Sequence, residues 1–129
     1  MHLITPDIAR RLAANAVRAG VADHKPAPVL KLFNPMGPAT WLATEIGSDD
    51  DTLFGLADLG FGCPELGYFS LREIAAIRLP FGLTIERDTE FSTDVPLSRW
   101  ADEARASRSI IAAEREFRGR GIEQEESSP

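Results

Sequence analysis

The sequence predicts an α+β domain built on a mostly antiparallel, twisted sheet of four or five strands, with helices packed on one face. Two observations lead to this class. Short segments rich in β-branched, aromatic and aliphatic residues alternate with turn residues from position 29 to position 87. Signals for helix starts lie before, within and after this run. With 129 residues, 43% of them hydrophobic, the chain is long enough to bury one core.

The first element is a helix that begins at Thr5 and Pro6. Threonine is a favoured N-cap, and proline is a favoured first helical residue. An apolar stripe follows, and Gly20 is a suitable C-terminal stop. Residues 21–28 then form a loop, because the two prolines in this segment cannot continue a helix.

Two strands follow, at residues 29–33 and 40–46. The short turn at 34–38 predicts that they form an antiparallel hairpin. Alternation divides the second strand into two faces. One face would carry Trp41, Ala43 and Glu45, and the other would carry Leu42, Thr44 and Ile46.

The remaining strands of the predicted sheet lie at residues 52–57, 65–69 and 83–87. A short helix at 71–77 separates the last two. Its start is marked by Ser70 and Glu73, which have the spacing of a capping box. The transition from strand to helix at Ser70 therefore fixes the architecture of the middle of the chain.

The C-terminal part begins with a third helix near Pro96 or Ser98. The end of the chain is rich in glycine, glutamate and serine, a composition typical of disorder. We therefore expect residues 1–100 to form a single α+β domain, residues 101–118 a helical C-terminal extension, and residues 119–129 a disordered acidic tail.

The net charge of −6 is distributed unevenly. Residues 41–95 contain three arginines and eleven acidic residues, a net charge of −8, whereas residues 1–40 have +3 and residues 96–129 have −1. An acidic central segment disfavours a broad phosphate-binding surface, which needs clustered lysine and arginine. It favours contact with a basic protein surface.

Cysteine and histidine are too few for most metal or nucleophilic sites. Cys63 is the single cysteine, so no intramolecular disulfide can form, and its turn-like setting favours a packed small residue. The two histidines, His2 and His24, lie in no motif with the spacing of a metal site or a catalytic triad. Glycine-rich phosphate loops are also absent from the sequence. We therefore expect no metal site and no cofactor.

Four carboxylates in or near the strands are the candidates for catalysis. If their strands are neighbours, these groups would converge and shift each other's pKa, as general acid and base pairs do. Surface charges and an ion pair of Arg87 are the simpler interpretation. The four candidates are Glu45, Glu65, Glu86 and Asp88.

Aromatic and charged residues of the central segment are the candidates for binding. Trp41 and Tyr68 combine an apolar ring with a polar group, as residues at interfaces do. The run Asp49, Asp50 and Asp51 is acidic but lacks the alternating ligands of a calcium loop. The complete set of binding candidates is Trp41, Asp49, Asp50, Asp51, Tyr68 and Arg87.

The strings at residues 41–45, 53–56, 65–71 with Glu73, 82–83, 85–88 and 96–97 carry a family resemblance. In this order they resemble the bacterial family catalogued as domain of unknown function 2958 (DUF2958), over roughly residues 3–100. The resemblance implies a small, stand-alone protein of plasmids and related mobile DNA, with a role in element maintenance, conjugation or countering host defence. The family has no assigned activity, so the resemblance assigns no catalytic residues to this chain.

We expect a non-enzymatic interaction protein that presents its acidic surface to a basic protein, for example one that handles nucleic acid. A small carboxylate-dependent enzyme is the first alternative. The second is a weak nucleic-acid binder that uses the basic first helix. We expect a protein partner, no membrane partner and a cytoplasmic location. The sequence does not decide whether two copies of the chain also pair through the edge strands of their sheets.

Overall fold

The computed structural model describes residues 3–21 and 23–126, and it confirms the α+β class. All neighbouring strands of its five-stranded sheet are antiparallel, in the order β4-β3-β2-β1-β5. The elements are α1 (Pro6–Val17), β1 (Leu30–Phe33), β2 (Thr40–Ile46), β3 (Thr52–Asp58), β4 (Glu65–Ser70), α2 (Leu71–Ala75), the short 3-10 helix η1 (Pro80–Gly82), β5 (Glu86–Arg87), α3 (Leu97–Ser107) and α4 (Ile110–Glu126).

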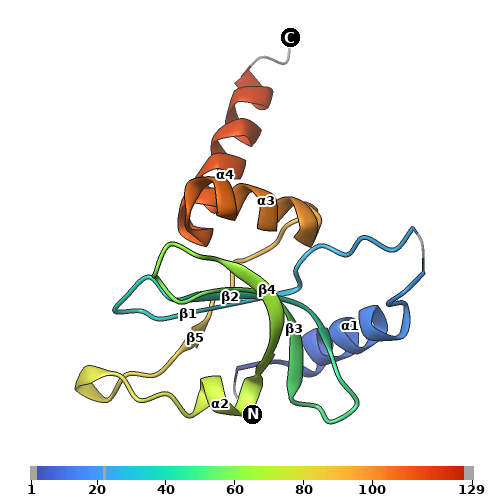
Figure 1. The fold of residues 1–129 in the computed structure, drawn as a ribbon, viewed down its shortest axis with the longest axis vertical. Helices are drawn as coiled ribbons and strands as arrows, with labels where there is room; N and C mark the ends of the chain where they lie inside the picture. The colour runs from blue at the N-terminus through green and yellow to red at the C-terminus, as the bar shows by residue number, and fades with distance from the viewer. Residues whose placement is uncertain (1–2, 22, 127–129) are drawn as a thin grey trace.

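The helices cover both faces of the sheet, which corrects the expectation of one covered face (Figure 1). On one face, α1 and α2 pack against a core that includes Trp41 and Leu53. On the other, α3 and α4 pack against Leu42 and Leu56. The strands carry large apolar side chains on both faces, so each face requires a helical cover to exclude water.

A β-bulge at Thr44 changes the predicted division of β2 into faces. Ala43 pairs with Gly55 and Glu45 with Phe54, so Thr44 is the extra residue. Ile46 therefore joins the core that contains Trp41, rather than lying opposite it as strict alternation predicts. The Asn15 side chain of α1 donates a hydrogen bond of 2.9 Å to the Thr44 carbonyl oxygen, which compensates for the irregular pairing.

Gly55 lies opposite this bulge and has no space for a side chain. A Cβ atom placed there would overlap the carbonyl oxygen of Leu42 and lie 2.8 Å from the Cα of Ala43. Close backbone approach is a common reason for glycine within a strand. The glycine of the string at 53–56 therefore has a structural role.

The C-terminal residues differ most from the sequence prediction. The helical C-terminal part is interrupted at Arg108, whose φ of 66° is left-handed, and this break separates α3 from α4. Ala101, Ala104 and Ile110 are buried against the sheet. The segment 101–118 thus contributes buried residues to the core of the domain.

α4 also includes most of the expected disordered tail, because it continues through Glu126. Glutamate, glutamine and arginine are good helix formers, so a helix that has already started can extend through them. Residues 127–129 lie outside the described residues. β5 and α2 are shorter than predicted, since β5 begins at Glu86 and α2 ends at Ala75.

Both predicted N-caps are confirmed. The Thr5 hydroxyl oxygen accepts a hydrogen bond from the Ile8 N–H at 3.2 Å, and Pro6 is the first residue of α1. The Ser70 hydroxyl oxygen accepts one from the Glu73 N–H, also at 3.2 Å. These caps fix where the two helices begin on their shared face of the sheet.

Candidate functional site

The four carboxylate candidates are not brought together. Glu65 is the first residue of β4 at one edge of the sheet, whereas Glu86 and Asp88 lie in and after β5 at the opposite edge. Four strand spacings of about 4.8 Å place these edges roughly 19 Å apart. Glu45 lies between them on β2, paired with Phe54. The geometry therefore separates Glu45 and Glu65 from each other and from the two carboxylates near β5, and one of those two, Asp88, is ion-paired with Lys31.

Asp88 is engaged in a structural ion-pair cluster. The Lys31 ammonium lies 3.3 Å from an Asp88 oxygen and 3.0 Å from a Glu114 oxygen, with 12% of the lysine side chain exposed. This cluster joins β1, the chain after β5 and α4. Arg87 also has a structural contact, because its guanidinium donates a hydrogen bond of 3.0 Å to the Leu3 carbonyl oxygen.

The acidic run after β2 stabilises its own turn and the start of α2. Asp49 accepts hydrogen bonds from the Thr52 hydroxyl at 2.6 Å, the Thr52 N–H at 2.9 Å and the Asp51 N–H at 3.0 Å. These bonds, the Thr52 hydroxyl first, lower the pKa of Asp49 to about 2. Asp51 accepts from the Ser70 hydroxyl at 2.7 Å and the Arg72 N–H at 2.8 Å.

Of the two aromatic binding candidates, only Tyr68 is on the surface. Trp41 is 6% exposed and packs in the core, whereas Tyr68 on β4 is 76% exposed. The Tyr68 ring centroid lies 5.1 Å from that of Phe54. Strand register places Glu45, Phe54 and Tyr68 in one row across β2, β3 and β4. The structure thus brings two sequence candidates, Glu45 and Tyr68, onto the same row.

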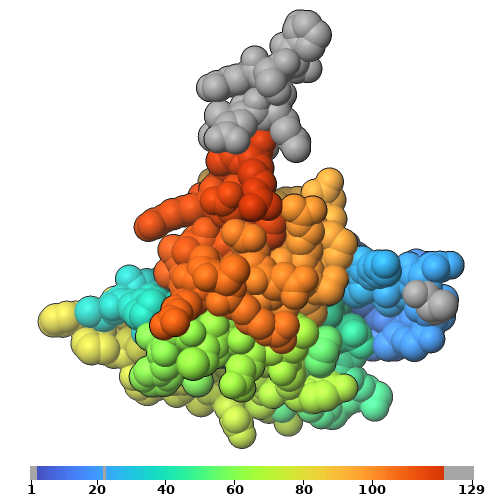
Figure 2. Space-filling model, turned by 45° about the horizontal axis from the view of Figure 1, so that its top comes forward, coloured from blue at the N-terminus to red at the C-terminus, as the bar shows by residue number. Residues whose placement is uncertain are grey.

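The outer side of β4 is the clearest candidate for an interaction site. β4 pairs with β3 on one side and has no strand partner on the other within the described residues. Exposed side chains follow β4 and the loop before it, and Figure 2 shows this green face open beneath the orange α3. We call this surface the β4 edge, defined by Leu59, Phe61, Glu65, Leu66 and Tyr68.

A hollow of about 180 Å³ lies beside the same cross-strand row. His24, Glu45 and Phe54 are among the residues that line it. The Nε2 atom of His24 is buried, and no hydrogen-bond partner for it exists in the described part of the chain. Glu45 is the only one of the four carboxylate candidates among the lining residues, so this hollow does not assemble the expected pair.

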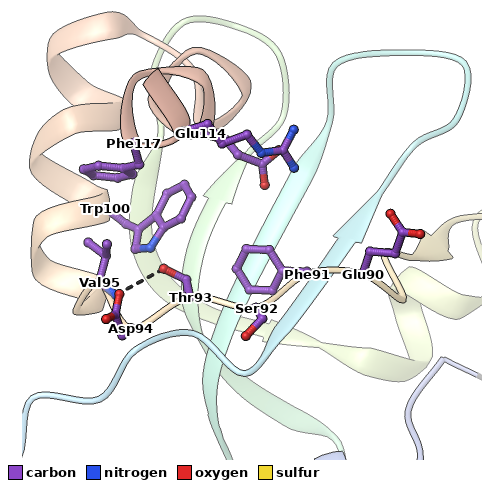
Figure 3. A pocket seen from close by; sticks show the side chains of 10 residues that line it. Glu90, Phe91, Ser92, Thr93, Asp94, Val95, Trp100, Glu114 and Phe117 are labelled. Carbon is purple, nitrogen blue, oxygen red and sulfur yellow. Dashed lines mark hydrogen bonds and ion pairs between the residues drawn. The ribbon is translucent and has the colours of Figure 1, made fainter. Parts of the chain in front are cut away.

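A second hollow, of about 300 Å³, lies between residues 90–95 and the helices α3 and α4 (Figure 3). Its floor is aromatic. The ring centroid of Trp100 lies 4.7 Å from that of Phe117 and 6.1 Å from that of Phe91. Sequence reasoning missed this site, because it depends on the break between α3 and α4.

These features define a small α+β protein with helices on both faces of its sheet and one long open edge. Within the described ranges, no group of three or more histidine, cysteine, aspartate or glutamate side chains is arranged to hold a metal ion. No described helix has both the length and the apolar character needed to cross a membrane.

The chain belongs to the family described as Protein of unknown function (DUF2958), which matches residues 3–111. The match confirms the resemblance and extends it past residue 100, through α3 to the start of α4. This extent agrees with the packing of α3 against the sheet. No curated protein and no solved structure matches the chain.

Proposed function

We propose that this chain is a non-enzymatic interaction protein that binds a basic partner protein along the β4 edge. The observation that supports the proposal is the exposed Tyr68 on a six-residue edge strand. Edge strands leave backbone N–H and C=O groups free to pair, and proteins usually protect them with proline, lysine or a bulge. β4 reads Glu65-Leu-Gly-Tyr-Phe-Ser70, with no proline, lysine or bulge, and its one charged residue is at its first position.

A partner segment would bind by adding a strand to the sheet. Backbone hydrogen bonds to β4 would supply affinity, and contacts to alternate side chains would supply specificity. Leu66 and Tyr68 are two residues apart, so their side chains lie on the same face of the strand. Tyrosine is enriched among the residues that dominate binding energy at interfaces, so Tyr68 is the expected anchor.

The charge around β4 favours a basic partner. Glu65 lies exposed at the start of the strand. The Asp51 contact with Ser70 brings the acidic turn to the other end, where Asp50 and Glu73 are exposed. Acidic groups at both ends of the strand would speed association with a basic segment and make its binding sensitive to salt.

The biological setting of the proposal rests on the family resemblance. We infer a role in plasmid or mobile-element biology, in which the partner is a basic protein that handles nucleic acid. Binding would then occupy the surface that this partner uses for DNA. A cytoplasmic location follows from such a role.

The proposal is tested by affinity purification from a bacterial host at low and at high salt, with protein and nucleic acid both measured in the eluate. The expected result is a stoichiometric basic protein that is released by salt and is absent when Tyr68→Ala is the bait. Retention of the same protein by Tyr68→Ala, or binding unchanged by salt, would overturn the proposal.

A further inference from the structure

We propose that the hollow between residues 90–95 and the helices α3 and α4 binds a basic side chain, arginine or lysine, carried by an extended peptide. We call it the Trp100 hollow, lined in part by Phe91, Trp100 and Phe117. It lies beside the chain that follows β5, and β5 and β4 are the strands at opposite edges of the sheet. It is therefore a site separate from the β4 edge.

The first observation is an unsatisfied donor. Trp100 is 2% exposed, and its indole N–H has no hydrogen-bond partner in the described part of the chain. Leaving a buried donor unpaired costs about 1–3 kcal/mol, so native proteins usually pair such groups. In Figure 3 the ring nitrogen of Trp100 is on the side of the indole nearest Thr93, within the lining of the hollow. A ligand with an acceptor, such as a peptide carbonyl, would satisfy this donor.

The second observation is the aromatic wall. In Figure 3 the ring of Trp100 lies between those of Phe117 and Phe91. Aromatic faces attract guanidinium and ammonium groups. The cluster already holds one such group, because the guanidinium carbon of Arg99 lies 5.9 Å from the ring centroid of Phe117. The ring of Phe91 also lines the hollow and could contact a second cation.

The third observation is the charge of the lining. Glu90 and Asp94 are exposed at its two ends, and neither forms an ion pair within the described residues (Figure 3). Glu114 is engaged with Lys31 at 3.0 Å and with Arg118 at 3.4 Å. The carboxylates without partners therefore outnumber free basic groups in the lining, which favours a cation and disfavours a phosphate or a carboxylate.

These observations together specify the ligand class. A neutral aromatic compound would leave the carboxylates unpaired, and a simple cation would leave the Trp100 N–H unpaired. A peptide with a basic side chain satisfies both, because its carbonyl oxygen accepts from Trp100 while its cation lies beside Phe91, attracted by the carboxylates at the two ends of the hollow. A volume of about 300 Å³ leaves room for one long side chain.

The test uses the full chain labelled with ¹⁵N and observes the indole N–H signals of its two tryptophans. A Trp41→Phe variant assigns the signal of Trp100. The probe is the blocked tripeptide acetyl-Gly-Arg-Gly-amide, and its control carries citrulline, which has the same shape without the charge. We expect a saturable shift of the Trp100 signal with the arginine peptide and at least about tenfold weaker binding of the citrulline peptide.

Two exposed substitutions provide a test that does not disturb the core. The double variant Glu90→Gln, Asp94→Asn should bind the arginine peptide about tenfold more weakly than wild type. Glu65→Gln, at the β4 edge, should bind it as wild type does. No shift of the Trp100 signal, equal binding of the citrulline peptide, or an unaffected double variant would overturn the inference. Because the probe is a short peptide, this result does not depend on whether a partner binds the β4 edge.

Discussion

The carboxylate of Asp58, at the end of β3, accepts a hydrogen bond of 2.9 Å from the N–H of Ile110, the first residue of α4. Its other oxygen accepts one of 2.9 Å from the Gly60 N–H. Only 1% of Asp58 is exposed. One buried carboxylate thus holds both the loop after β3 and the start of α4, and it connects the last helix to the sheet.

Replacing Asp58 by alanine should lower the free energy of unfolding by about 2–4 kcal/mol, because two N–H groups lose a charged acceptor and one of them is buried. Urea denaturation measures the change. Asp102→Ala is the matched control, since the Asp102 side chain is 81% exposed and its ion pair with Arg105, at 3.8 Å, is on the surface. The control should change stability by less than about 0.5 kcal/mol. Equal effects of the two variants would contradict the role assigned to Asp58.

Two glycines that pair across β3 and β4 should respond differently to alanine. A methyl group at Gly55 would overlap the Leu42 carbonyl oxygen, whereas nothing lies within 4 Å of the corresponding position at Gly67. We expect Gly55→Ala to destabilise by about 2–4 kcal/mol through distortion of the β2–β3 pairing. Gly67→Ala should stay within about 1 kcal/mol of wild type by thermal or urea unfolding. A tolerated Gly55→Ala would show that the bulge at Thr44 can rearrange.

The pH dependence of stability should include a contribution from Asp49. The pKa of this carboxyl is lowered from 3.8 to about 2 in the folded chain by bonds from Thr52 and Asp51. A lowered folded-state pKa stabilises the native state above the unfolded value, and this stabilisation is lost as the pH falls from 3.8 toward about 2. The stability difference between wild type and Asp49→Asn should therefore shrink over this window.

Urea unfolding of both proteins across this acidic range measures that difference, and an NMR titration of the Asp49 carboxyl carbon gives its pKa directly. Asp50→Asn is the control, because Asn tolerates the left-handed conformation of this position, where φ is 55°. A constant difference between wild type and Asp49→Asn from neutral pH downward would contradict the assignment.

Local signals predicted where α1 and α2 begin. The caps at Thr5 and Ser70 are short-range hydrogen bonds, which depend only on residues three positions apart. The bulge at Thr44 and the break at Arg108 could not be predicted in the same way. The bulge depends on Gly55 from another strand, and nothing in the sequence around Arg108 signals its left-handed conformation.

The candidate site could be predicted only in part. Tyr68 was a sequence candidate because it combines an aromatic ring with a hydroxyl group. Phe61 and Leu66 could not be recognised as surface residues from the sequence. Their exposure follows from the position of β4 at the edge of the sheet, and long-range pairing sets the strand order. Trp41 also combines an aromatic ring with a polar group, but it lies in a central strand and is buried.

The charge of the partner can be tested by changing Tyr68 to residues of opposite charge. Tyr68→Lys would repel a basic partner and Tyr68→Glu would attract it, although both variants lose the ring. We expect the lysine variant to bind the partner at least about tenfold more weakly than the glutamate variant. Val17→Lys, at an 85% exposed position on α1, controls for added positive charge. Equal binding of the two Tyr68 variants would exclude a basic contact at this position.

The most direct test of the central claim is site-specific photo-crosslinking in bacterial cells, with benzoylphenylalanine in place of Tyr68 or, as the control, of Val17. Both positions are exposed, but only Tyr68 lies on the β4 edge. Our account predicts that position 68 crosslinks to one basic protein and that position 17 does not. Crosslinking of the same protein from position 17 alone, or only acidic proteins from position 68, would contradict it.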